Sequence, residues 1–211
     1  MSRRNMAAAL LIMAAPCASA QRLGEPSNWI GGGIALWQSQ AVNDPRTHGI
    51  WDLGGAAQYR GSLEFPLARG TSFGVAGTYA TVPLTFQTTG ASVCGTCDAN
   101  VTVTQVLGVV HVGGESDFHP VLDIQAGATS FAGLKSTDGQ SLGLDHPVTD
   151  FTIVIGYGFG FMLSPTTEVT IVQDLGTILH ARATGTGGGD NTPRQFITRL
   201  GLRYAVGGRT R

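Results

Sequence analysis

Charged residues are scarce in this sequence. They make up 13% of its 211 residues, about half the share that is usual in soluble domains. Beyond residue 20 the sequence lacks helical periodicity, and it lacks any apolar run of the ~20 residues that a transmembrane helix needs. Glycine, in contrast, is abundant, with 31 residues. This combination is unusual for a soluble globular protein, but it suits β-strands whose outer face meets lipid.

The N-terminal segment has the features of a secretory signal peptide. Arg3 and Arg4 give it a positive start, Met6–Ala15 is an apolar run, and Ala18–Ala20 puts small residues at the positions that a signal peptidase reads. The apolar run is too short to cross a bilayer as a helix, which needs ~20 residues. The sequence therefore predicts that residues 1–20 are cleaved after export to the periplasm.

Two other interpretations of this segment stay open. It could be a membrane-anchoring first helix, or Cys17 could be the lipidated residue of a lipoprotein, although Ala14 and Pro16 fit that processing site poorly. With the signal segment and its two arginines removed, residues 21–211 form one domain. They hold 11 basic residues against 14 acidic ones, a formal charge of −3. No strong basic field remains, so we expect no nucleic-acid partner.

Strict alternation of apolar and small residues is clearest in Phe151–Met162. Phenylalanine, tyrosine and isoleucine occupy every second position there, and the glycines at 156, 158 and 160 lie on the opposite face. A period of two is typical of β-strands. The same pattern recurs in Phe196–Val206. Both segments are therefore predicted to be strands with one apolar face.

Residues 50–65 are expected to form one strand, with Trp51, Leu53 and Tyr59 on a single apolar face. Other segments predicted as strands lie near residues 29–38, 72–80, 101–112, 121–130 and 167–179. Two of them carry apolar residues on both faces, so their register stays open: 101–112 and 167–179.

The connections between these eight segments alternate in length. Short turns are predicted at Pro66–Thr71, Gly113–Phe118 and Ser164–Thr166, and longer connections at Ser39–Thr47, Gln87–Asn100, Lys135–Pro147 and Ala181–Pro193. Outer-membrane barrels have this layout, with short periplasmic turns and longer external loops. The predicted fold class is therefore all-β: an eight-stranded antiparallel up-and-down transmembrane β-barrel.

The apolar faces are expected to form the lipid belt, with aromatic girdles near both interfaces. The girdle at the short turns would hold Tyr59, Phe73, Phe161 and Tyr204. The girdle at the long loops would hold Trp37, Trp51, Tyr79, Phe131, Phe151 and Phe196.

The opposite faces should fill the interior, since eight strands leave just enough room for side chains. Glycines on these faces are expected to make space for long arginines, which need carboxylate partners because an unpaired buried charge is costly. The predicted charge network in the lumen consists of Arg60, Glu64, Asp123, Glu168, Asp174, Arg199 and Arg203. A structural role for it is expected; a narrow pore or proton path is the alternative.

The end of the sequence resembles the C-terminal signal that the outer-membrane insertion machinery reads. Arg199, Gly201, Tyr204 and Val206 match its polar residue, its glycine and its two alternating hydrophobic residues. Over nearly its whole length, the exported chain resembles the small eight-stranded outer-membrane β-barrel proteins of bacteria. This resemblance implies that the outer membrane is the location, and that membrane lipid and the insertion machinery are partners.

Cys94 and Cys97 lie in the second long connection. Because an exported chain meets an oxidising compartment, a disulfide is expected. A thiol-exchange site normally has a helix N-terminus beside one thiol, and a metal site needs further ligands; neither is predicted here. The histidines, His48, His111, His119, His146 and His180, are scattered and are expected to face solvent where they lie in loops.

The sequence contains no motif of a hydrolase, metalloprotease or phosphate-binding loop. We therefore expect no catalytic residues, metal or cofactor, and a structural or surface-interaction role with the external loops as contact surface. Three alternatives stay open: a soluble lipocalin-like barrel with an apolar ligand, a membrane-embedded lipid-modifying enzyme, and a small channel. The lipocalin-like barrel would have the reverse polarity, with its apolar faces inside.

Overall fold

The computed structural model describes most of the chain after the predicted signal segment, which lies outside the described residues. The described residues are 28–39, 41–44, 47–88, 94–114, 116–180 and 193–206. No helix among them is long and apolar enough to cross a membrane.

All regular structure in these ranges is β. The strands are β1 (Asn28–Ser39), β2 (Val42–Asp44), β3 (Gly49–Leu53), β4 (Ala56–Ala68), β5 (Thr71–Thr88), β6 (Thr96–Val112), β7 (Phe118–Ser136), β8 (Val148–Ser164), β9 (Thr167–Leu179) and β10 (Arg194–Val206).

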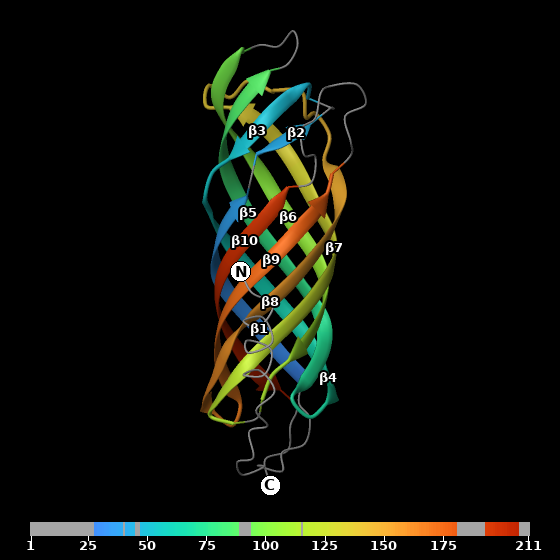
Figure 1. Cartoon of the computed structure of the whole chain (residues 1–211), viewed down its shortest axis with the longest axis vertical. Helices are drawn as coiled ribbons and strands as arrows, with labels where there is room; N and C mark the ends of the chain where they lie inside the picture. The colour runs from blue at the N-terminus through green and yellow to red at the C-terminus, as the bar shows by residue number, and fades with distance from the viewer. Residues whose placement is uncertain are drawn as a thin grey trace, which may run out of the picture.

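Eight of these strands close into an antiparallel barrel, and β2 and β3 form an extra hairpin at one end (Figure 1). Each barrel strand pairs with its neighbours in the chain, β1 also pairs with β10, and β5–β6 pairing completes the ring. The prediction of an eight-stranded up-and-down barrel is confirmed. The ends at which β4 meets β5, β6 meets β7 and β8 meets β9 lie together, and we call this the turn end; the opposite end of the barrel, which carries the β2–β3 hairpin, is the loop end.

The outer surface of the barrel is apolar over much of its height. On β8, every second residue from Phe151 to Phe161 is exposed, and Phe159 has 55% of its surface accessible. On β10 the same holds for Phe196, Leu200, Leu202 and Tyr204. The predicted apolar faces of these two strands do point outward, which is the reverse of a lipocalin-like barrel.

The outer face changes polarity along β5 and β6. On β5 the exposed residues are apolar up to Tyr79, beyond which Thr81 and Pro83 take the outward positions. On β6, Thr104 lies opposite Tyr79. The outward residues are apolar on the turn side of this position, as far as Val106, and polar from Thr104 to the loop-side end of the strand. The inner face changes in the opposite sense, from polar to apolar.

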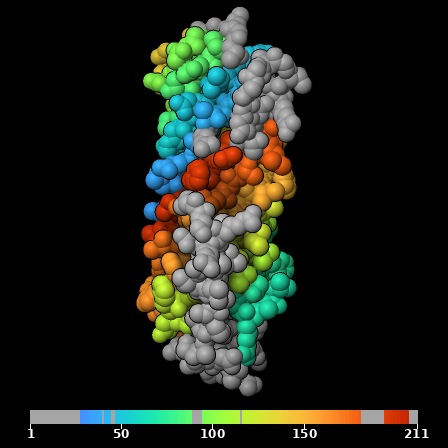
Figure 2. Space-filling model, in the orientation of Figure 1, coloured from blue at the N-terminus to red at the C-terminus, as the bar shows by residue number. Residues whose placement is uncertain are grey.

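This inversion explains why the register of residues 101–112 could not be predicted. The strand is apolar outside near the turn end and apolar inside near the loop end, so neither face is apolar throughout. Strands β5 to β8 have 17 to 19 residues, whereas ~9–11 cross a bilayer. Their excess length forms an extension at the loop end, which we call the cap; in Figure 2, β3 and the start of β6 lie at this upper end.

The cap encloses a hydrophobic core. Its largest buried side chains are Trp37, Trp51, Phe86, Phe131, Leu134 and Ile178. Burial of such side chains contributes about 1.5–3 kcal/mol each, so the cap is stabilised in the same way as a small soluble domain.

Two predictions about the loop end are wrong. Residues 50–65 do not form one strand, because the strand is interrupted at Gly54–Gly55. Both sides pair with β5, but the register shifts by one residue between the pairs Leu53–Leu84 and Gln58–Ala80. On the other edge β3 pairs with β2, whereas β4 pairs with β1. Trp51 and Leu53 consequently face the interior, with Trp51 only 1% exposed, while Tyr59 faces outward. Gly54 donates its backbone N–H to the carbonyl of Pro83, which holds the break in place.

The predicted aromatic girdle at the long loops is also only partly present. Tyr79, Phe151 and Phe196 are exposed on the outer face, but Trp37, Trp51 and Phe131 are buried in the cap core. They occupy inward positions of their strands and pack in one buried cluster. Of the girdle predicted at the turn end, Phe73, Phe161 and Tyr204 are exposed near that end. Tyr59 is also exposed, but it pairs directly with Tyr79 and therefore lies at the height of the loop-end girdle, so its predicted place is wrong.

Candidate functional site

The turn half of the lumen is polar, and its central group is the guanidinium of Arg199. Arg199 Nε donates to Asp174 Oδ2 at 3.1 Å, and a second nitrogen pairs with Asp123. Arg60 donates to Gln125 Oε1 at 2.9 Å, and Gln125 in turn donates to Asp174 Oδ1 at 3.3 Å. These contacts tie strands β4, β7, β9 and β10 together across the lumen.

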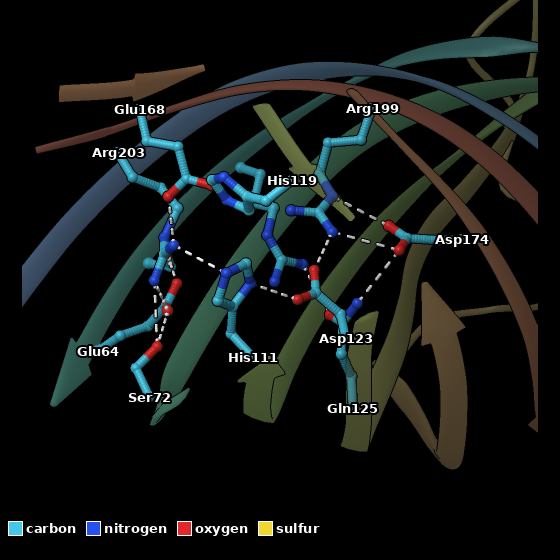
Figure 3. A network of polar contacts seen from close by, with 12 residues as sticks. Glu64, Ser72, His111, His119, Asp123, Gln125, Glu168, Asp174, Arg199 and Arg203 are labelled. Atoms are coloured by element: carbon cyan, nitrogen blue, oxygen red, sulfur yellow. Dashed lines mark hydrogen bonds and ion pairs between the residues drawn. The ribbon is translucent and has the colours of Figure 1, made fainter. Parts of the chain in front are cut away.

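Arg203 forms a second group, nearer the turn end. Its two terminal nitrogens donate to Glu168 Oε2 and Glu64 Oε2, each at 2.6 Å. The ring of Trp29 stacks on the guanidinium, 4.7 Å from Arg203 Cζ. The structure therefore brings all seven residues of the predicted lumen charge network into one interior region, and Figure 3 shows how the two arginine groups adjoin.

Two histidines join this network that were not predicted to belong to it. His111 Nδ1 lies 2.7 Å from Asp123 Oδ1, and its Nε2 lies 2.9 Å from an Arg203 nitrogen. His119 Nε2 lies 3.1 Å from Glu168 Oε1. The alternation along β7 could have predicted the position of His119. It lies four residues before Asp123, so both side chains point to the same, inward face.

The glycines of β8 leave space for carboxylates rather than for arginines. A Cβ at Gly156 would meet Asp174 Oδ1, and one at Gly160 would meet Glu168 Oε1 and His119 Nε2. The prediction that these glycines accommodate the arginines directly is wrong, because the carboxylates stand between β8 and the guanidinium groups.

A layer of glutamines lies between the charged turn half and the apolar cap. Gln195 Oε1 accepts hydrogen bonds from Trp37 Nε1 at 2.9 Å and from Gln105 Nε2 at 3.1 Å. Gln105 also donates to Thr129 at 2.9 Å. Neutral amides pair here without introducing charge next to the hydrophobic core, and the buried Nε2 of Gln195 has no hydrogen-bond partner among the described residues.

The cap holds a separate buried polar cluster around His180. Its Nε2 lies 2.8 Å from Asp44 Oδ1, and its Nδ1 pairs with Asp150. Thr47 donates to Asp44 through both its backbone N–H and its hydroxyl, and it accepts from Trp51 Nε1 at 2.9 Å. Since His180 is 136 residues away from Asp44, no local sequence pattern predicts this contact.

Burial alone would lower the pKa of His180, but the hydrogen bonds to Asp150 and Asp44 outweigh it and raise this pKa to about 9. Burial likewise opposes ionisation of Asp44, yet its hydrogen bonds from His180 and Thr47 lower the pKa of this carboxyl. His180 is therefore charged at neutral pH and fastens the β2 segment to β8 and to the end of β9.

A cavity of about 590 Å³ opens at the turn end. Its polar wall is formed by Ser72, His111, Glu168 and Arg203, and its rim includes Arg69 and Asp117. Deeper in the lumen, a pocket of about 20 Å³ is lined by residues that include Arg60, Asp123 and Arg199. We call the larger cavity the vestibule.

Cys94 and Cys97 form a disulfide that packs against the cap core. The residues of the predicted insertion signal all lie on β10: Arg199 faces inward, Tyr204 faces outward, and Gly201 and Val206 are half-buried. The role of the four residues as a signal stays a prediction.

Comparison with known proteins gives a structural likeness but no sequence match. The sequence matches no protein-family model and no curated protein. The structure is similar to that of Neisserial surface protein A, with a TM-score of 0.58, 12% sequence identity, and 84% of this chain and 96% of that chain covered. The fold is that of the small outer-membrane β-barrels.

Two further structures give lower scores. One is Ail, the attachment invasion locus protein of Yersinia pestis, in complex with the heparin analogue sucrose octasulfate (TM-score 0.47, 14% identity, 85% of this chain and 98% of that chain covered). The other is the outer membrane protein OprG from Pseudomonas aeruginosa (TM-score 0.45, 13% identity, 84% and 95% covered).

In the lumen and cap clusters, acidic side chains are paired with arginines and histidines. Each described carboxylate in them that meets an arginine or histidine does so through a direct hydrogen bond. Within the described ranges, no group of three or more His, Cys, Asp or Glu side chains has the geometry of a metal site. Chemically, the arrangement can hold strands together and bind protons.

Proposed function

We propose that this protein is an integral barrel of a bacterial outer membrane, exported by the segment 1–20. Its turn end faces the periplasm, and its cap stands outside the membrane. Its role is structural or one of surface contact rather than catalysis. The cap is the contact surface, since binding residues are commonly carried by loops on a rigid scaffold.

The observation that carries this proposal is the polarity inversion of the outer face. On β5 and β6, the exposed residues below the row formed by Tyr79 and Thr104 are apolar, and those above it are polar apart from Pro83. An apolar band of limited height around a closed barrel fits a bilayer, because peptide groups in lipid must all be paired within the protein. A soluble barrel has no reason to change its outer polarity at one height.

A pair of substitutions on the outer face of β5 tests the membrane location. Val75 and Thr81 both point outward on this strand, on either side of Tyr79. In a bilayer, Val75→Arg should cost about 2–4 kcal/mol if Val75 lies near the midplane, whereas Thr81→Arg near the interface should cost about 0–1 kcal/mol. Both proteins are folded into lipid vesicles, and their urea unfolding is followed by tryptophan fluorescence.

Fractionation of the expressing cells gives an independent readout. The protein should remain in the washed outer-membrane fraction and should show a heat-modifiable gel shift. Recovery as a dissolved periplasmic protein, or equal and small effects of both arginine substitutions, would contradict the proposal and favour a soluble barrel.

The side chains packed into the lumen support a non-conducting barrel. Above the vestibule, the side chains of the lumen network, the glutamine layer and the cap core occupy the lumen. In planar lipid bilayers the purified protein should therefore give no steady ion conductance. Stable conductance steps in the wild-type protein would favour the small-channel alternative instead.

The insertion machinery is proposed as the assembly partner, through Arg199, Gly201, Tyr204 and Val206. The outward position of Tyr204 supports this, because its ring is accessible on the last strand. Tyr204→Ala should slow the appearance of the heat-modifiable form in cells. The similarly exposed Tyr59→Ala on β4 serves as the control and should assemble at the wild-type rate.

A further inference from the structure

The hydrogen-bond partners of His119 define its protonation state. Its Nδ1 lies 2.9 Å from the backbone carbonyl oxygen of Ser116, and its Nε2 lies 3.1 Å from Glu168 Oε1. Glu168 is held as a carboxylate by Arg203, which donates to its other oxygen at 2.6 Å. A carbonyl and a carboxylate only accept hydrogen bonds, so both ring nitrogens of His119 must donate. A ring that donates from both nitrogens is an imidazolium.

His111 has partners of a different kind. Its Nε2 lies 2.9 Å from an Arg203 nitrogen, and a guanidinium can only donate. Nε2 of His111 must therefore accept, which leaves the proton on Nδ1, 2.7 Å from Asp123 Oδ1. His111 is thus a neutral imidazole that relays a hydrogen bond between Arg203 and Asp123.

The charges of the lumen network agree with this assignment. Its three arginines stand against four carboxylates, so the arginines alone leave one negative charge without compensation; the network comprises Arg60, Arg199, Arg203, Glu64, Asp123, Glu168 and Asp174. One histidine proton restores neutrality, and the geometry assigns it to His119. An uncompensated buried charge is costly, which gives the protein a reason to retain this proton.

We infer that His119 and Glu168 form a proton-binding site at the turn end of the lumen. The site is built rather than incidental: Gly160 leaves the space in which the two side chains meet, and both are almost completely buried. Glu168 lines the cavity at the turn end, so a proton reaches the pair from that side. With the orientation proposed above, this is the periplasmic side.

The surroundings of His119 contain few other titratable groups. Glu168 of β9 touches it, Arg203 of β10 lies beyond Glu168, and His111 of β6 lies beyond Arg203. The adjoining residue of β8 is Gly160, which has no charge, and the turn before β7 contributes the carbonyl of Ser116. Loss of the proton would therefore remove one of the two hydrogen bonds by which His119 links Ser116 of the turn to Glu168 of β9.

The site is tested by nitrogen-15 NMR of histidine-labelled protein in lipid nanodiscs at pH 7.5. His119 should show the two similar ring-nitrogen shifts of an imidazolium, and His111 should show the two well-separated shifts of a neutral ring. His111→Gln and His119→Gln spectra assign the signals. A neutral His119 at this pH overturns the inference, as does a charged His111.

Two variants separate the proton site from a purely structural contact. Glu168→Gln keeps an acceptor oxygen for His119 but removes the negative charge, so His119 should lose its proton at pH 7.5. His146→Gln changes an exposed loop histidine and should leave the His119 signal unmoved. If Glu168→Gln leaves His119 charged, the carboxylate does not hold the proton and the inference fails. Should a variant fail to insert, the wild-type spectrum still decides.

Discussion

Gly160 of β8 lies directly against the imidazole of His119, so closely that a Cβ at position 160 would overlap both His119 Nε2 and Glu168 Oε1. Gly160→Ala should therefore push the pair apart and destabilise the barrel by about 1–3 kcal/mol, the usual cost of overpacking a filled interior. Urea unfolding in lipid vesicles measures this loss.

Gly77→Ala is the matched control for this substitution. A Cβ at Gly77, on the outer face of β5, would meet no atom within 4 Å. Alanine there should leave the stability unchanged or raise it slightly, because it restricts the unfolded chain more than glycine does. Equal losses for the two variants would mean that the effect at Gly160 is one of strand propensity and not of contact.

Arg199→Met should be among the most damaging single substitutions in the lumen. It leaves Asp123 and Asp174 buried without their cation, and removal of one partner from a buried ion pair costs about 3–5 kcal/mol. Arg194→Met on the exposed face of the same strand should change stability by about 0.5 kcal/mol or less. The triple variant Arg199→Met, Asp123→Asn, Asp174→Asn should regain much of the loss; no recovery would argue against the ion pairs as the cause.

The His180 cluster should make the cap sensitive to alkaline pH. The folded pKa of His180 is about 9, above its ordinary value of 6.5. Its stabilising contribution is therefore complete below pH 6.5, falls between pH 6.5 and about 9, and is lost above that range. The shift corresponds to about 3 kcal/mol at most.

Proteolysis of the cap at a series of pH values measures this effect. Wild-type protein should become more susceptible as the pH rises from 6.5 to about 9, while His180→Gln should be susceptible throughout and nearly independent of pH. His146→Gln, at an exposed position, should follow the wild type. A wild-type profile that stays flat to pH 10 would contradict this role of His180.

The disulfide between Cys94 and Cys97 should affect the cap locally. It spans a sequence separation of 3 residues, and a loop this short restricts the unfolded chain little, by about 2 kcal/mol. The double variant Cys94→Ser, Cys97→Ser should therefore still give the heat-modifiable barrel, but protease should cut near residue 94 faster. Loss of the barrel form would show that the disulfide is needed for assembly.

The sequence predicts which side chains face outward better in the turn half of the barrel than in the cap. On β8 and β10 the alternation correctly predicts which residues face outward, and on β7 it places Asp123 and His119 on one inward face. It also places Trp37 with Ala35, and Phe131 with Asp123, on inward faces. Trp37 and Phe131 were nevertheless assigned to an outward-facing aromatic girdle. That assignment fails because both residues lie above the apolar band.

The first long connection could not be predicted in this way. The strand is interrupted at Gly54–Gly55, so odd-numbered residues face inward on β3 and outward on β4. Only the pairing of β3 with β5 determines this change of register. The contact of His180 with Asp44 could not be predicted either, since it joins residues that are 136 positions apart in the sequence.

The sequence by itself determined the number of barrel strands, their order, the alternation of short and long connections and the interior position of the charged residues. These follow from a period-two pattern, which each strand carries within itself. Only the tertiary structure decided where the outer face stops being apolar, which acid meets which base, and which histidine keeps a proton. Those depend on the relative height of strands across the ring, which is set by hydrogen-bond register between segments far apart in the chain.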